Sequence, residues 1–119
     1  MEETRIIKLT YNFSLKIIPL YGNLVKQGEF IISKQLLRSG TSIGANVFEA
    51  SAAISKKDFA NKMSIASKEA RETYYWLKLL KDSNLSKIDL SEYIREVRSI
   101  IFVLTAIVKT TQRRIRQMK

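Results

Sequence analysis

Apolar residues recur every three or four positions along four long stretches of this chain, which is the spacing of one face of an α-helix. Each stretch would form a helix of about 30 Å or longer. Helices that are joined by short connections pack side by side in opposite directions. The pattern therefore predicts a single all-α domain with an antiparallel up-down-up-down four-helix bundle, whose helices cover about residues 4–26, 31–53, 56–81 and 90–117.

Residues that favour helix ends stand at the boundaries of these stretches. Gly28 follows the first stretch, and a glycine just beyond the last turn commonly ends a helix. Ser55 precedes the third stretch and Asp58 stands three residues later, as in a helix N-cap. Asp89 and Glu92 have the same spacing, and they predict the start of the fourth helix at about residue 90.

The second stretch contains two glycines, Gly40 and Gly44, on neighbouring helical faces. A glycine inside a helix costs about 1 kcal/mol relative to alanine, so a local gain should offset it. The usual gain is close approach, because another helix can lie almost on the backbone where Cβ atoms are missing. We therefore predict that a second helix packs directly on Gly40 and Gly44.

Several stretches carry more apolar surface than one core face needs. The third stretch adds the aromatic run Tyr74–Trp76 outside its main apolar face, and the last stretch adds Ile100, Phe102, Val103 and Ile107. Surplus apolar and aromatic surface on a small bundle usually marks a protein interface. The chain is therefore predicted to form a homo-oligomer.

Composition removes several classes of function. The 119 residues include no cysteine and no histidine, which excludes disulfides, thiolate catalysis and imidazole acid–base chemistry, and most zinc, haem and di-iron sites. We expect no cofactor and no metal. The longest apolar run, Ile100–Val108, is too short for a bilayer, and no signal peptide is evident. A cytoplasmic protein without membrane association is expected.

Positive charge is concentrated at the C-terminal end. The formal net charge is +10, and the segment from Val97 to Lys119 contains six basic residues and no acidic one. Such asymmetry is typical of a protein that binds nucleic acid or an acidic protein. A solvated helix end, which the helix dipole also favours, is the alternative. The candidate RNA-binding residues are Lys109, Arg113, Arg114, Arg116 and Lys119.

Polar residues on the second and third stretches form a second candidate cluster. Antiparallel pairing would bring Arg38 within reach of two carboxylates, and its planar guanidinium can bind both. A structural network that fixes the helix register is the main hypothesis, and a ligand or RNA phosphate held by Arg38 is the alternative. The predicted network comprises Arg38, Asn46, Glu49, Glu69 and Glu72.

Two further functions have weaker support in the sequence. A magnesium-dependent nucleotide hydrolase would need a second acidic pair facing Glu69 and Glu72. Glu92 and Glu96 are the available pair, but antiparallel pairing places them about two turns from Glu72. The aromatic run Tyr74–Trp76 beside Lys78 and Lys81 could stack bases, although a core or subunit-interface role suits it better. The protein is therefore predicted not to be an enzyme.

Three segments carry a family resemblance: Gln35–Ala50 (QLLRSGTSIGANVFEA), Ser55–Phe59 with its Ser-x-x-Asp-Phe pattern, and Ile65–Leu77. They resemble the bacterial four-helix bundle proteins that are encoded in intervening sequences of 23S rRNA genes, also called 23S rRNA-associated proteins. Phe48 and Ala50 depart from the usual residues of that family, a smaller apolar residue and glycine.

This resemblance implies a fold, an assembly and a partner. It implies an antiparallel four-helix bundle that assembles as a homopentameric ring with a central channel. It also suggests an association with ribosomal RNA through gene location. The chain is similar as well to the accessory bundle protein of diversity-generating retroelements, which acts with a reverse transcriptase and nucleic acid.

Overall fold

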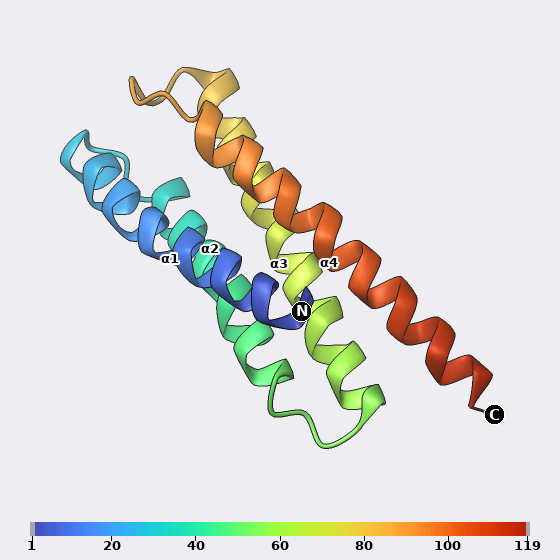
Figure 1. Cartoon of the computed structure of the whole chain (residues 1–119). Helices are drawn as coiled ribbons and strands as arrows, with labels where there is room; N and C mark the ends of the chain where they lie inside the picture. The colour runs from blue at the N-terminus through green and yellow to red at the C-terminus, as the bar shows by residue number, and fades with distance from the viewer. Residues whose placement is uncertain (1, 119) are drawn as a thin grey trace.

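The computed structural model describes residues 2–118, which form four α-helices and no strand (Figure 1). The all-α four-helix fold that the apolar pattern predicts is therefore confirmed. The molecule is elongated, with principal dimensions of 53 × 23 × 23 Å. The helices are α1 (Glu2–Lys26), α2 (Ile32–Ala50), α3 (Lys56–Ser83) and α4 (Ser91–Gln117).

Local hydrogen bonds decide where the helices begin and end. Ser55 Oγ accepts a hydrogen bond of 3.0 Å from the Asp58 backbone N–H, so Ser55 caps α3. Asn84 adopts a left-handed conformation with φ of 58° and ends that helix. Gly28, with φ of +91°, follows the end of α1.

Five helix boundaries differ from the sequence prediction, by one to three residues, and the largest difference is at the end of α2. α2 ends at Ala50 instead of Ala53, because Ala52 and Ala53 donate to carbonyls three residues back and form tight turns. α4 begins at Ser91, whose backbone N–H donates to Asp89 Oδ1 at 3.0 Å. The pKa of Asp89 is lowered mainly by that hydrogen bond.

The core lies along the inner faces of all four helices. Its side chains recur with helical spacing, as the sequence pattern predicts. Burial of this kind contributes about 25 cal/mol per Å² of apolar surface removed from water. The largest buried side chains include Phe13, Ile17, Leu20, Leu36, Ile43, Met63, Leu77, Leu80 and Leu104.

α1 packs directly on the two glycines of α2. A Cβ atom at Gly40 would lie 3.1 Å from the side chain of Ile17. A Cβ atom at Gly44 would lie 3.2 Å from the carbonyl oxygen of Thr10 and 3.3 Å from Ser14 Oγ. The missing side chains therefore let two helix backbones approach closely, which offsets the low helix propensity of glycine.

α4 is held mainly by α3 and meets α1 only over a short stretch. Lys16 of α1 joins the two helices there, because it pairs with Glu96 and lies 3.6 Å from Glu92. The hydrogen bond with Glu96 is the largest factor that raises the pKa of Lys16. Beyond this contact α4 continues well past the N-terminal end of α1 (Figure 1). The C-terminal half of α4 is consequently exposed on one side.

Candidate functional site

The exposed C-terminal end of α4 carries the basic residues that the sequence analysis selects. Lys109, Arg113, Arg114 and Arg116 are all exposed on this helix. Lys119, the fifth candidate, lies outside the described residues. We call the four described residues the basic end of α4.

The basic end is electrostatically uncompensated within the described part of the chain. No ion pair between described residues involves any of its four members. The last turn of a helix has a partial negative charge, which accommodates part of this positive charge. The remainder faces solvent, where it can attract anions over about a Debye length, roughly 8 Å at physiological salt. Phosphate groups are anions of the required kind.

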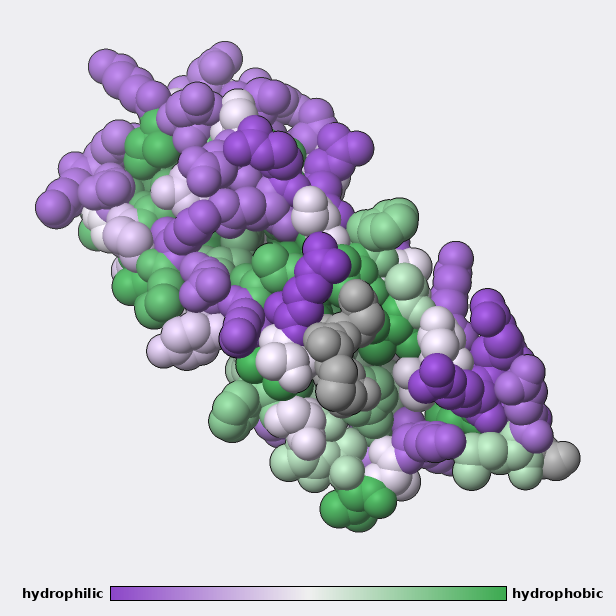
Figure 2. Space-filling view, in the orientation of Figure 1, coloured by the Kyte–Doolittle hydropathy of each residue, from purple (hydrophilic) through white to green (hydrophobic). Residues whose placement is uncertain are grey.

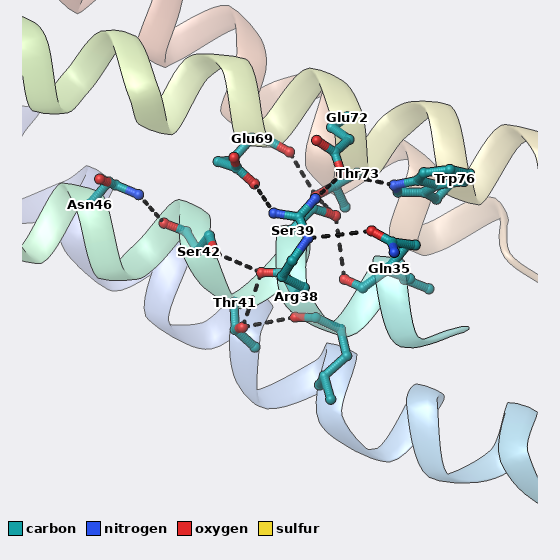
Figure 3. A network of polar contacts seen from close by, with 12 residues as sticks. Gln35, Arg38, Ser39, Thr41, Ser42, Asn46, Glu69, Glu72, Thr73 and Trp76 are labelled. Carbon is teal, nitrogen blue, oxygen red and sulfur yellow. Dashed lines mark hydrogen bonds and ion pairs between the residues drawn. The ribbon is translucent and has the colours of Figure 1, made fainter. Parts of the chain in front are cut away.

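A second polar site connects α2 and α3 around Arg38 (Figure 3). Arg38 Nη1 donates to Glu69 Oε2 at 3.1 Å, and Nη2 donates to Glu72. Arg38 Nε donates to Gln35 Oε1 at 3.3 Å. Trp76 Nε1 donates to the same Glu72 oxygen at 3.0 Å. Glu72 therefore receives hydrogen bonds from two helices, and the guanidinium of Arg38 is engaged on three sides.

A buried hydrogen bond lies beneath this network. Thr73 Oγ1 and Ser39 Oγ are 2.9 Å apart, and both side chains are inaccessible to solvent. Thr73 Oγ1 also donates to the Glu69 backbone carbonyl at 2.8 Å, so it acts as the acceptor from Ser39. Such a pair stabilises only the register that brings the two hydroxyls together, because a displaced hydroxyl would be buried without a partner.

The electrostatics of the network favour its ionised form. Burial opposes the charge on Arg38, but the hydrogen bond and charge of Glu72, with a smaller contribution from Glu69, outweigh it and raise the pKa of the guanidinium. The hydrogen bond from Trp76, followed by that from Arg38, lowers the pKa of Glu72 below its ordinary value of 4.5 despite partial burial. Both groups are therefore charged near neutral pH.

The structure corrects two members of the predicted network. Glu49 lies outside it, because it is about three turns further along α2 than Arg38 and pairs with Lys62 at 3.3 Å. Asn46 is connected only indirectly: its side-chain amide donates to the Ser42 carbonyl at 2.8 Å, and Ser42 Oγ donates to the Arg38 carbonyl. Both residues share a helix face with Arg38, but they lie too far along the helix axis for the guanidinium of Arg38 to reach them.

Sequence reasoning missed the polar role of Trp76. The sequence places it in an aromatic run, and its edge-on contact with Tyr75, with ring centroids 5.2 Å apart, fits that reading. Its indole N–H nevertheless serves Glu72, four residues earlier on the same helix. The spacing of four residues between a carboxylate and an indole is the signal that could have indicated this contact.

The acidic residues considered for a hydrolase do not gather in one place. Glu69 and Glu72 face Arg38, whereas Glu92 and Glu96 face Lys16 on another side of the bundle. Among residues 2–118, no group of three histidine, cysteine, aspartate or glutamate side chains is close enough to hold a metal ion.

Glu72→Gln tests the network through its pH dependence. Because the folded state lowers the pKa of Glu72, the carboxylate stabilises the fold above its ordinary pKa of 4.5, and this contribution is lost as pH falls through the lower folded-state value. We expect the substitution to cost about 1 kcal/mol at neutral pH. The difference from the native protein should shrink below pH 4.5.

Urea unfolding over a range of acidic pH values measures this effect. Glu49→Gln is the matched control, because Glu49 is 58% exposed and pairs with Lys62 alone. It should change the free energy of unfolding by no more than about 0.5 kcal/mol. Equal losses in the two variants, or a Glu72→Gln effect independent of pH, would contradict the assignment.

The four helices make this a small all-α protein, and the comparisons with known proteins agree with that fold class. The family model of the 23S rRNA-intervening sequence protein matches residues 2–106. The chain belongs to this family. A crystal structure of a protein of unknown function from the S23 ribosomal protein family of Bacteroides thetaiotaomicron is 43% identical, with a TM-score of 0.84 over 92% of this chain and 99% of that one. No curated protein matches the sequence.

The family match ends before the basic end of α4, whose members begin at Lys109. The family match therefore does not cover these residues, and their role is argued from this chain alone. None of the helices described for the chain combines the length and hydropathy that a membrane crossing requires.

Proposed function

We propose that this protein is a non-enzymatic, oligomeric four-helix bundle that binds RNA through the basic end of α4. The observation that carries the proposal is the exposed group of four basic side chains on a helix segment with no acidic residue from Val97 onwards. Sequence-independent attraction to phosphates suits such a surface, because it needs charge and exposure and no shaped pocket. The family's association with 23S rRNA genes agrees with an RNA partner.

We propose an antiparallel up-down-up-down topology for the bundle. Residue numbers rise along α2 as they fall along α3, since Arg38 pairs with Glu72 and Glu49 pairs with Lys62. The colour gradient along the chain in Figure 1 agrees with a reversal at each connection.

The assembly is proposed from the exposed apolar face of α1. Tyr11, Leu15 and Ile18 are 63%, 52% and 52% exposed, and their spacing puts them on one face. Phe48 of α2, 69% exposed, adds to the apolar surface available to a second copy. We propose that these faces form contacts between copies of the chain. The assembly that the family resemblance implies is a homopentamer, which would multiply the basic end fivefold.

Light scattering tests the assembly. At micromolar concentration we expect a mass several times the 13.7 kDa of one chain. Leu15→Lys together with Ile18→Lys should reduce that mass, because two charges would be buried in the contact. Asn12→Lys together with Asn23→Lys adds the same two charges at exposed positions on another side of α1 and should leave the mass unchanged. A native protein that scatters as a monomer would rule out the ring.

The RNA proposal is tested by what the native protein retains during purification. A lysate is divided, one half is treated with nuclease, and the protein is isolated from both at low salt. We expect RNA to accompany the protein in the untreated half and to be removed by a high-salt wash. Absence of RNA in both halves contradicts the proposal, and an acidic protein in its place would favour a protein-interaction scaffold.

A further inference from the structure

A groove of about 1000 Å³ runs along α4, with further walls from α1 and α3. It exists because α1 meets α4 only over a short stretch and leaves one side of α4 uncovered. We call it the α4 groove. In Figure 2 hydrophobic surface lies in the middle of the displayed face, between a hydrophilic region and the hydrophilic C-terminal end of α4.

The α4 groove is lined by cations and by apolar side chains. Among the described residues that line it, none is acidic. Phe102, Val103 and Ile107 supply apolar contacts, and Phe102 is 77% exposed. The basic lining residues are Arg5, Lys81, Arg95, Arg98 and Arg114. An occupant must therefore be acidic and must also have an apolar face.

We propose that the α4 groove binds an acidic amphipathic helix of a partner protein. An apolar helix face would cover Phe102, Val103 and Ile107 as a neighbouring helix of the bundle would, and its carboxylates would meet the arginines along the rim. The rise from Arg95 to Arg114 is about 29 Å, which is the length of a helix of about 19 residues. The proposal concerns a different surface from RNA binding, and the two share only Arg114.

Most of the surplus apolar residues of α4 line this groove, and the sequence predicts that they form contacts between copies of the chain, but charge argues against a second copy as the occupant. The exposed apolar face of α1 also carries Lys8 and Lys26, so it would bring positive charge to a positive groove. Of the acidic side chains, Glu72 and Glu96 are already engaged by cations of their own chain. Like charges placed together at an interface oppose association.

The apolar floor argues against RNA. Single-stranded RNA gains its non-electrostatic affinity by stacking bases on aromatic faces. Two lining residues are aromatic, but Phe59 is partly buried against the core. Val103 and Ile107, near Phe102, are aliphatic and provide no such platform. Aliphatic surface of this kind is instead covered well by leucine or isoleucine from a helix.

The test is a display library of 18-residue helical peptides, selected on the native protein. Enriched peptides should carry aspartate or glutamate together with apolar residues at helical spacing. The groove variant combines Arg98→Glu with Phe102→Ser. The control variant combines Lys34→Glu with Phe30→Ser, which makes the same kinds of change, a cation to glutamate and phenylalanine to serine, at exposed positions outside the groove and outside the proposed contacts between copies. Thermal melts establish that both variants are folded.

Fluorescence anisotropy of an enriched peptide then measures affinity. We expect the dissociation constant to rise at least tenfold for the groove variant and to stay unchanged for the control variant. A peptide of the same composition in scrambled order should bind the native protein at least tenfold more weakly, which excludes attraction by net charge alone.

Each other outcome overturns the proposal. These outcomes are failure to enrich any peptide, enrichment of peptides without acidic residues, and equal binding by the groove variant. Loss of oligomeric mass in the groove variant would assign the groove to contacts between copies. Loss of affinity for oligouridine, with peptide binding unchanged, would assign it to RNA.

Discussion

Gly44→Leu is expected to destabilise the fold by about 1–3 kcal/mol or more. Its Cβ atom alone would lie 3.2 Å from the carbonyl oxygen of Thr10, which belongs to the backbone of α1 and cannot turn aside as a side chain could. The rest of the leucine would then push α1 away from α2 and open the core between them. Thermal or urea unfolding measures the loss.

Gly22→Ala is the matched control, because it also replaces a glycine inside a helix. A Cβ atom at Gly22 meets no atom within 4 Å, so the substitution gains helix propensity without a clash. It should raise stability by about 0.5–1 kcal/mol. The two glycine substitutions are thus expected to differ in sign. A Gly44→Leu protein as stable as the native one would show that α1 can shift without cost.

The second large effect concerns RNA affinity. The triple variant Arg113→Gln, Arg114→Gln and Arg116→Gln removes most of the basic end while leaving exposed polar side chains in place. For each contact with a phosphate of single-stranded RNA that is lost, the plot of log affinity against log salt concentration should become less steep by about 0.7. Three lost contacts would flatten the slope by about 2 and weaken binding on the order of 100-fold at low salt.

A charge-matched variant separates location from net charge. Lys26→Gln, Lys34→Gln and Lys87→Gln also remove three positive charges, but from the opposite end of the bundle. The connection between α1 and α2 and the connection between α3 and α4 lie side by side at that end, where Ser86 donates a hydrogen bond of 3.2 Å to Gln27. This variant should retain most of the RNA affinity. Equal losses in both variants would show that only the net charge matters.

The fold could be predicted from the sequence because its determinants are local. Apolar residues at three-to-four spacing define each helix, and Ser55 and Gly28 mark two of the ends. The contact of Arg38 with Glu69 and Glu72 could also be anticipated, since a guanidinium is long enough to tolerate an error of a residue or so in the register. The end of α2 at Ala50 depends on individual hydrogen bonds, and the apolar pattern places it three residues too late.

Other features depend on the relative placement of helices, which periodicity does not specify. The buried bond between Ser39 and Thr73 requires the register of α2 and α3 to be known to one residue. The α4 groove depends on how far α4 diverges from α1, where Lys16, Glu92 and Glu96 supply one of the few contacts. Sequence reasoning finds the arginines of α4, but not the empty space beside them.

The most direct test of the central claim is the affinity of the native protein for a fluorescent single-stranded RNA, measured as a function of salt. We expect binding at low salt, little dependence on RNA sequence, and a logarithm of affinity that falls linearly with the logarithm of the salt concentration. No binding at low salt would contradict the account, and the basic end of α4 would then be only a charged helix terminus.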